Sequence, residues 1–570
     1  MEDIPPFRKE EELRSAEVIA RSLRTVWQSS PKWAAVSGAC VVLNAMLPLA
    51  LLWSMSRMVD ATLASMRSAS EFSATDILPP LLTFGAALFA TYALSAITDW
   101  CTSELGERLR GHVAEEVQKK MSRVSYQTMQ SPQFQTDTFR AVTGSTRLPV
   151  NIYFSTLGAV ESFLTFLAMG GWLMSVSWWL PLVVLLSGAP VMAVRLWDTR
   201  EAYKLYRGLA GDERREHYYN SVLTHPRYAP EVRLFGIADW FRGKFAVIHG
   251  QAAGARIRQE RRSAALQVAA SALSTLAVLA VFVVVIVMSA QGGLSVGALA
   301  TCLLAIRRAE SAVTTLSKRS MSLHSQELYI RSLFEFLSLE DETSRRAEFP
   351  RDFERINVSG VSFSYPGSDR KALEGLSLSI GRGEVVGLRG GNGSGKSTLV
   401  KLLCGLLRPD EGSVNIDGVE VSDIAPAEVS RHVTAVFQDF MVYCATASEN
   451  IRFGNIDGEA NITKERDAAR SAGIDDLLSG LREGYATELG NHFPGSEMLS
   501  RGEWQRLAQA RVFYSDAEII ILDEAASALD PGARQTLRDN IERLRREGKT
   551  LIIVSHLSET ISMADRVIDL

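Results

Sequence analysis

Long apolar runs fill the first half of the chain. Four segments contain no Asp, Glu, Lys or Arg, and they cover residues 33–56, 77–98, 162–194 and 263–306. A helix that crosses a membrane needs about 20 mostly apolar residues, so each of the first two runs fits one helix. The last two runs are 33 and 44 residues long, and polar or small residues interrupt them at 175–179 and 291–293. The pattern predicts a six-helix transmembrane domain over residues 33–335, against the alternative of long buried helices in a soluble protein.

Basic residues are distributed unevenly between these runs. Residues 99–150 carry seven Lys or Arg and residues 195–262 carry fourteen, whereas residues 57–76 carry two. Because cytoplasmic loops concentrate basic residues, we expect both termini and the two long basic segments to lie in the cytoplasm, with the spans in the cell inner (cytoplasmic) membrane. Proline interrupts the helical pattern of the basic segments near 131–134 and 225–230, where we expect their tips, so these helices should continue well beyond the bilayer.

Residues 1–32 lack the apolar core that a cleavable leader would need. Val18, Leu23, Val26 and Trp27 stand among Arg and Glu residues, which is typical of an amphipathic helix lying at the membrane surface in contact with lipid. We therefore expect a cytoplasmic or interfacial helix before the first span.

Charged residues follow closely after the apolar part of the sixth expected span. Arg307, Arg308 and Glu310 come soon after the apolar residues that begin this span, and an arginine at the centre of a lipid-facing helix costs roughly 2.5–3.5 kcal/mol. One interpretation is that these residues line a wet substrate cavity, where they pair with each other or with Glu161. The other is a short span that leaves them already in the cytoplasm.

Residues 350–570 have the pattern of a soluble α/β domain. The apolar strand 385–388 leads into a glycine-rich loop and then a helix, with the spacing G-x-x-x-x-G-K-S. In this context the spacing predicts a phosphate-binding loop, in which backbone amides converge on the phosphates, Lys396 supplies a positive charge and Ser397 offers a hydroxyl to Mg²⁺. The ATP-binding residues expected here are Gly390, Gly391, Asn392, Gly393, Ser394, Gly395, Lys396, Ser397 and Thr398.

Two further apolar strands end in residues that suit nucleotide hydrolysis. The run 519–522 ends in Asp523 and Glu524, and the run 551–554 is followed by His556 one residue later. Because ligands bind at the carboxyl ends of parallel strands, we expect Asp523 to hold Mg²⁺ and Glu524 to polarise the attacking water. His556 could contact the γ-phosphate. The alternative for the two acids is a solvated strand end.

Ser500 and Glu503 have the S-x-x-E spacing of a capping box that opens a long helix. With Gly502 beside it, such a helix N-terminus is also an anion site.

Other compositional features exclude rather than indicate functions. The net charge is −4 and only 22% of residues are charged, which argues against nucleic acid as a partner. The five cysteines have no metal-type or paired spacing.

Together these residues resemble an ATP-binding cassette (ABC) exporter of the half-transporter type over nearly the whole chain. Residues 499–506 resemble the family signature, and 527–530 resemble the D-loop with Asp530. Gln438 lies in the counterpart of the Q-loop, and Tyr365 takes the place of the aromatic residue that stacks on adenine. The resemblance implies a membrane α-helical domain, with six transmembrane helices and long cytoplasmic extensions, fused to an α/β P-loop ABC ATPase domain.

The resemblance also implies a mechanism with ATP and Mg²⁺ as cofactors. The ATPase domains of two copies, a homodimer, would close head to tail on ATP. Gln438 would sense Mg²⁺ and the water, and His556 would hold the γ-phosphate. Each ATP would lie between Lys396 of one copy and the signature residues of the other, which are Ser500, Arg501, Gly502 and Glu503.

This sequence departs from the family pattern at three places. Arg501 and Glu503 replace the usual glycine and glutamine of the signature, which puts neighbouring polar contacts in doubt. The chain also stops at residue 570, where family members continue, so we expect a trimmed C-terminal tail.

Residues 231–236, 437–440 and 502–505 look most like exporters of modified peptides such as lasso peptides, lantibiotics and microcins. The resemblance implies a small modified peptide as the substrate. The alternatives are a multidrug, lipid or siderophore-type exporter or flippase, an ATP-gated channel, and a soluble ABC ATPase.

Overall fold

The computed structural model describes residues 15–67, 74–131, 134, 148–291, 295–342, 345, 347–368, 370–527 and 529–570. Contacts divide the chain into two compact units. The first comprises residues 1–119 and 136–338, and the second comprises residues 120–135 and 339–570. The second unit therefore includes a short piece of the first long cytoplasmic segment.

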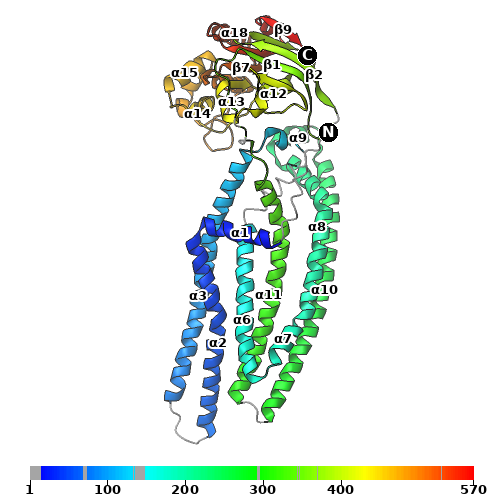
Figure 1. Cartoon of the computed structure of the whole chain (residues 1–570), viewed down its shortest axis with the longest axis vertical. Helices are drawn as coiled ribbons and strands as arrows, with labels where there is room; N and C mark the ends of the chain where they lie inside the picture. Colours follow the sequence, from blue (N-terminus) through cyan, green and yellow to red (C-terminus); the bar gives the residue numbers. More distant parts are fainter. Residues whose placement is uncertain are drawn as a thin grey trace. The chain divides into compact units, whose positions relative to one another are not determined.

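The first unit consists of long helices that run side by side (Figure 1). Its elements are α1 (Ser15–Ser29), α2 (Pro31–Arg67), α3 (Ala74–Met121), α6 (Leu148–Val176), α7 (Leu180–Ser187), α8 (Ala189–Thr224), η1 (Pro226–Tyr228), α9 (Ala229–Leu234), α10 (Ala238–Ala290) and α11 (Val296–Leu337).

Both helical interruptions predicted within the apolar runs are present. α6 ends at Val176 and α7 begins at Leu180, and α10 ends at Ala290 before α11 begins at Val296. The second cytoplasmic turn lies where the prolines near 225–230 predict it, because α8 ends at Thr224 and η1 follows. The turn predicted at 131–134 lies partly outside the described residues, which include 131 and 134 but neither residue between them.

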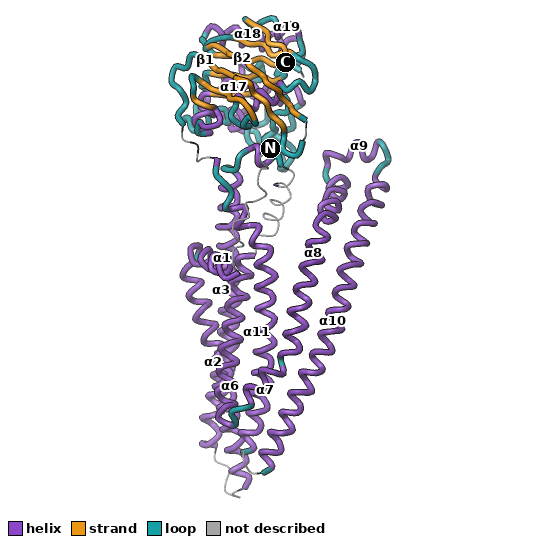
Figure 2. The backbone as a smooth tube through the Cα atoms, turned by 45° about the vertical axis from the view of Figure 1, so that its right-hand side comes forward, coloured by secondary structure: helices purple, strands orange, loops and turns teal. Residues whose placement is uncertain are grey.

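Several helices are much longer than a bilayer is thick. α3 has 48 residues and α10 has 53, which at 1.5 Å per residue gives lengths of roughly 70–80 Å, against about 30 Å for the hydrocarbon core. The predicted extension of these helices beyond the membrane is thus confirmed. α8 and α10 run together as an antiparallel pair to the turn at α9 (Figure 2).

Five helices of the described residues are long and apolar enough to cross a membrane: Pro31–Leu63, Leu78–Met121, Pro149–Val176, Leu180–Ala202 and Ala238–Ala290. The sixth predicted span, at the start of α11, does not meet the same criterion and stays a prediction. Its first turns are nevertheless core, because Cys302, Ala305 and Ile306 are fully buried among residues of α2, α6, α7 and α10. Asp60 of α2 also accepts a hydrogen bond of 3.0 Å from the Gly297 amide, which ties α2 to the first turn of α11.

The second unit contains two sheets with helices around them. Its strands are β1 (Arg355–Ser364), β2 (Lys371–Gly381), β3 (Val385–Arg389), β4 (Glu411–Ile416), β5 (Val419–Glu420), β6 (Val433–Val436), β7 (Ile519–Asp523), β8 (Thr550–Val554) and β9 (Arg566–Asp569). Its helices are α4 (Tyr126–Met129), α12 (Lys396–Leu403), η3 (Val421–Asp423), α13 (Pro426–His432), α14 (Ala447–Arg452), α15 (Ile462–Ser471), α16 (Asp475–Gly480), η4 (Gly484–Ala486), α17 (Arg501–Tyr514), α18 (Pro531–Arg546) and α19 (Ser558–Ile561).

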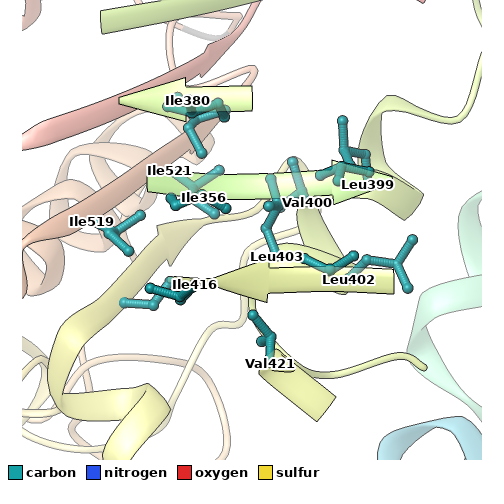
Figure 3. Packing of buried hydrophobic residues seen from close by; sticks show 14 of the residues in the cluster. Ile356, Ile380, Leu399, Val400, Leu402, Leu403, Ile416, Val421, Ile519 and Ile521 are labelled. Carbon is teal, nitrogen blue, oxygen red and sulfur yellow. The ribbon is translucent and has the colours of Figure 1, made fainter. Parts of the chain in front are cut away.

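The order of the strands determines where the polar residues meet. An antiparallel sheet has the order β2-β1-β4-β5, and a second sheet has the order β6-β7-β8-β3-β9 with every pair parallel. α12 packs between the two sheets: its Leu399, Val400 and Leu403 belong to one buried cluster with isoleucines from both, as Figure 3 shows. The carboxyl ends of β3, β6, β7 and β8 therefore lie at one edge, with α12 starting beside them.

Candidate nucleotide-binding and hydrolysis site

The glycine-rich loop connects β3 directly to α12. Gly395 is the N-cap of α12 and has a φ of 94°. A Cβ at this position would lie 2.4 Å from Leu373 Cδ2 and 2.5 Å from the carbonyl oxygen of Ala372, so only glycine fits. Lys396 Nζ donates hydrogen bonds of 2.8 Å to the carbonyl oxygens of Gly390 and Gly391, which holds the loop around the first turn of α12. The loop thereby presents a helix N-terminus and a lysine to an anion.

Tyr365 and Thr398 contact each other beside this loop. The Tyr365 hydroxyl lies 3.2 Å from Thr398 Oγ1, and Lys401 Nζ lies 5.7 Å from the centre of the Tyr365 ring. The structure thus brings Tyr365, at the end of β1, next to α12. Its role as the aromatic residue under adenine stays a prediction.

Asp523, the last residue of β7, is 2% exposed. Burial raises the pKa of this carboxyl, and a hydrogen bond from the Ser397 side chain partly offsets the shift. Its Oδ1 atom has no hydrogen-bond partner among the described residues. A buried, unsatisfied carboxylate oxygen beside a serine hydroxyl fits a hard divalent cation such as Mg²⁺, which takes oxygen ligands.

Three side chains from three strand ends meet at Glu524. Gln438 Nε2 donates a hydrogen bond of 3.0 Å to Glu524 Oε2, and His556 Nε2 lies 3.2 Å from Glu524 Oε1. The proposed general base, the Q-loop glutamine and the histidine therefore form one cluster at the edge of the sheet where the sequence placed them. Their catalytic roles stay predictions.

The backbone of Glu524 is held in an unusual conformation. Its φ is +52°, a conformation that costs of order 1–3 kcal/mol in a non-glycine residue and persists only when its surroundings enforce it. The Glu524 amide donates to the Val554 carbonyl at 2.8 Å. Gln505 Nε2 donates to the Glu524 carbonyl at 3.1 Å, and Gln509 Nε2 donates to the Ala525 carbonyl at 2.7 Å. These bonds fix the carboxylate in place.

The signature segment forms the predicted capping box. The Ser500 amide donates to Glu503 Oε2 at 2.7 Å, and the Glu503 amide donates to Ser500 Oγ at 3.4 Å. Within the described part of one chain, no hydrogen bond or ion pair joins the signature residues to the phosphate loop. Arg501 and Gly502 occupy the first turn of α17. The backbone amides of a first helical turn have no partner within the helix, and here they are separate from the phosphate loop of the same chain.

Asp530 has a structural role that the sequence did not reveal. Its side chain accepts a hydrogen bond of 2.9 Å from the Ala533 amide and caps α18. This bond, more than any other interaction, lowers the pKa of the Asp530 carboxyl. The function of Asp530 in a D-loop stays a prediction.

Comparison with known proteins agrees with this geometry. Residues 373–527 match the family model described as ABC transporter. The chain is 27% identical over 532 residues to the subtilin transport ATP-binding protein SpaT of Bacillus subtilis, covering 92% of this chain and 85% of that one. A solved bacterial Atm1-family ABC exporter with ATP bound superposes with a TM-score of 0.79 at 23% identity, over 95% of this chain and 93% of the other.

This chain has an ABC transporter ATPase domain and an ABC exporter fold.

Two further relatives match different shares of this chain. The nisin transport ATP-binding protein NisT of Lactococcus lactis subsp. lactis is 24% identical over 576 residues, covering 100% of this chain and 94% of that protein. An ATP-dependent lipid A-core flippase of Pseudomonas fluorescens (strain Pf0-1) is 32% identical over 284 residues, which is 50% of this chain and 46% of the flippase. The similarity to the subtilin and nisin transport ATP-binding proteins thus extends over the membrane helices.

The charged residues proposed for the substrate pathway of the exporter lie in pairs. Arg307 Nη1 lies 3.2 Å from Glu310 Oε2 one turn along α11, and the Arg307 side chain is 66% exposed whereas that of Glu310 is 20% exposed. Glu161 of α6 interacts electrostatically with Arg308 and with Arg319. The pair of Arg307 and Glu310 is therefore present, whereas an ion pair with Glu161 and the contact of these residues with substrate stay predictions.

Arg319 is a member of this cluster that sequence reasoning missed. A Cβ at Gly158 would lie 2.8 Å from Arg319 Nε, so the glycine leaves room for the guanidinium to lie against α6, less than one turn from Glu161. The only signal in the sequence was a glycine three residues before a glutamate within an apolar helix. That signal does not identify a partner on another helix.

Proposed function

We propose that two copies of this chain form an exporter in the cytoplasmic membrane, which couples Mg²⁺-dependent ATP hydrolysis to outward movement of a small modified peptide. The observation that carries this proposal is the cluster of Gln438, Glu524 and His556 beside the phosphate loop, in a chain whose other unit consists of membrane-length apolar helices. The full-length similarity to the subtilin and nisin transport proteins supports a peptide of the lantibiotic type.

The hydrolysis step follows from the arrangement around Glu524. Its carboxylate would accept a proton from the attacking water, and Gln438 and His556 hold both carboxylate oxygens in a fixed direction. Mg²⁺, when bound, would neutralise phosphate charge. Asp523 and Ser397 would hold the cation, because they present an unsatisfied buried oxygen and a hydroxyl at the same point. Lys396 would turn from the loop carbonyls to the phosphates.

Replacement of Glu524 by glutamine tests this assignment. Glu524→Gln keeps the size and the hydrogen-bonding capacity of the side chain but removes its basicity, so we expect ATP turnover to fall by about 10²–10⁴-fold while ATP binding is retained. Glu559→Gln is the matched control, because Glu559 is an exposed acid that pairs with Arg538. The assignment is refuted if Glu524→Gln hydrolyses ATP at the rate of the control.

If two copies of the chain complete each ATP site together, ATPase activity should follow a specific pattern in dimers of two differently tagged copies. One dimer would carry Lys396→Ala and Ser500→Arg on the same copy, and the other would carry one substitution on each copy. If Lys396 of one copy and Ser500 of the other complete each site, the first dimer has no intact site and the second keeps one. Sites built within single chains would reverse this result, since the first dimer would then keep an unmodified copy.

A lipid is the second candidate for the substrate. The similarity to lipid A-core flippases at 32% identity favours it, but that similarity covers half of this chain, whereas the peptide-related transporters match 92–100% of it. Substrate-stimulated ATPase activity in lipid discs separates the two. Stimulation by lantibiotic-type peptides and not by lipid A supports the peptide, and the reverse result supports the flippase.

A further inference from the structure

A cavity lies between α1 and the cytoplasmic extensions of three long helices. Its volume is about 640 Å³. Residues of α1 form one wall of the cavity. Residues 112–116 of α3 and 333–337 of α11 form the other walls, and Pro149 of α6 closes one side. α1 contacts α6 and α11 and lies across them, as Figure 1 shows. The cavity belongs to neither the ATPase site nor the charged cluster on α11.

The helix α1 has two different faces. Val18, Ser22 and Val26 recur every four residues and are buried against the bundle. Arg21 and Arg24 lie on the side that lines the cavity and are exposed. Because residues three apart in a helix are neighbours on its surface, the two guanidinium groups lie on the same wall.

The charges in the cavity leave these two arginines available. Neither Arg21 nor Arg24 forms an ion pair among the described residues. The two acids of the lining are already engaged, because Glu116 pairs with Lys119 at 3.4 Å and Glu17 has an interaction partner of its own. The lining thus combines two arginines with two glutamates, and no ion pair among the described residues holds either guanidinium.

The opposite wall of the cavity is apolar. Leu333, Phe334 and Leu337 of α11 face it with Val113 of α3, and the Arg21 guanidinium carbon lies 4.6 Å from the centre of the Phe334 ring. A site with a charged wall and an apolar wall fits a molecule that has an anionic head and an apolar body. Arginine forks match phosphate oxygens in a bidentate manner.

We propose that this cavity binds the phosphate group of an amphipathic molecule, with Arg21 and Arg24 on the phosphate and Leu333, Phe334 and Leu337 against its apolar part. A membrane phospholipid headgroup and a soluble phosphate ester share this chemistry. The chain favours the headgroup, because α1 ends at Ser29 and the first membrane helix begins at Pro31. The wall that carries both arginines is thus adjacent to the start of the bilayer.

Titration of the purified full-length exporter tests the proposal. Binding would be followed by native mass spectrometry, with phosphatidylglycerol, phosphatidylcholine of the same acyl chains, and glycerol phosphate as probes. Arg21→Gln with Arg24→Gln should weaken phosphatidylglycerol binding at least about 10-fold. Lys32→Gln is the matched control, because Lys32 is an exposed cation near α1 that does not line the cavity, and it should bind as the unmodified chain does.

The probes also identify the source of the phosphate. Retention of phosphatidylglycerol alone assigns a lipid headgroup site, and equal retention of glycerol phosphate assigns a site for soluble phosphate esters. Arg21→Lys with Arg24→Lys keeps the charge but removes the fork, so it should give an intermediate affinity.

Two results would overturn the proposal. One is phosphatidylglycerol binding by the double glutamine variant within about twofold of the control. The other uses the unmodified chain and does not depend on any substitution: the affinity should fall when the salt concentration rises from about 0.05 M to about 0.5 M, because salt screens charges. An affinity that does not change with salt contradicts a site built on two arginines.

Discussion

Arg511, on α17, connects the segment after the Q-loop to the signature helix. Its Nε donates to the Asn450 carbonyl at 3.0 Å, its Nη1 donates to the Met441 carbonyl at 2.9 Å, and its Nη2 donates to Asn450 Oδ1 at 2.6 Å. The guanidinium also lies 4.8 Å from the centre of the Tyr443 ring. Replacement of Arg511 by methionine keeps most of the volume and removes all three bonds.

The magnitude of this loss follows from two opposing contributions. Hydrogen bonds to a charged group contribute about 1.5–3 kcal/mol each. Burial lowers the pKa of Arg511 from 12.5 to about 10, which corresponds to ~3 kcal/mol of desolvation cost. For the three bonds together, the difference is a net contribution of about 1.5–6 kcal/mol, a range that includes the cost of removing one partner of a buried charged interaction. We take ~3 kcal/mol, or about a 100-fold change in the local opening equilibrium.

Hydrogen exchange of the full-length exporter measures this directly. In Arg511→Met, amides in residues 441–452 should exchange about 100-fold faster, while those of β7 should exchange as before. Arg506→Met is the matched control on the same helix, because half-buried Arg506 donates one hydrogen bond among the described residues, of 2.8 Å, to the Gly473 carbonyl. The reasoning is refuted if exchange in residues 441–452 of Arg511→Met stays within about threefold of the control.

Three further predictions concern the two sites. Gly395→Ala should lower the unfolding temperature of the ATPase domain by several degrees, because it combines a positive φ with a backbone clash, whereas Gly391→Ala, whose Cβ would meet no atom within 4 Å, should not. Asp523→Asn should raise the unfolding temperature in the absence of nucleotide and abolish Mg²⁺-dependent ATPase activity. Burial raises the folded-state pKa of Asp523. Its carboxyl therefore contributes most to folding stability below the unfolded pKa of about 3.9, and this contribution is lost as the pH rises. The increase in unfolding temperature caused by Asp523→Asn should accordingly disappear as the pH falls towards 4. Arg307→Gln with Arg308→Gln should remove substrate stimulation of ATPase activity, and unchanged stimulation would exclude these residues from the pathway.

The features that could be predicted from the sequence are those encoded locally. The helix breaks at 175–179 and 291–293 follow from small and polar residues within apolar runs, and the capping box of Ser500 and Glu503 follows from a three-residue spacing. The meeting of Asp523, Glu524 and His556 follows from a general property of parallel sheets, whose strand ends share one edge.

The features that could not be predicted depend on contacts between distant segments. Gln505 and Gln509 read as ordinary helix residues, yet they hold the carbonyls that follow β7. Arg319 lies against α6 only because Gly158 leaves space there. The positive φ of Glu524 has no local signal either, because glutamate rarely adopts this conformation and the surrounding hydrogen bonds enforce it.

Transport by the purified exporter in sealed proteoliposomes tests the central claim most directly. With the ATPase domains facing outward, addition of ATP and Mg²⁺ should move a lantibiotic-type peptide into the lumen, and Glu524→Gln should bind the nucleotide but move no peptide. ATP-independent passage of the peptide, or equal accumulation by Glu524→Gln, would contradict an account in which hydrolysis at Glu524 drives export.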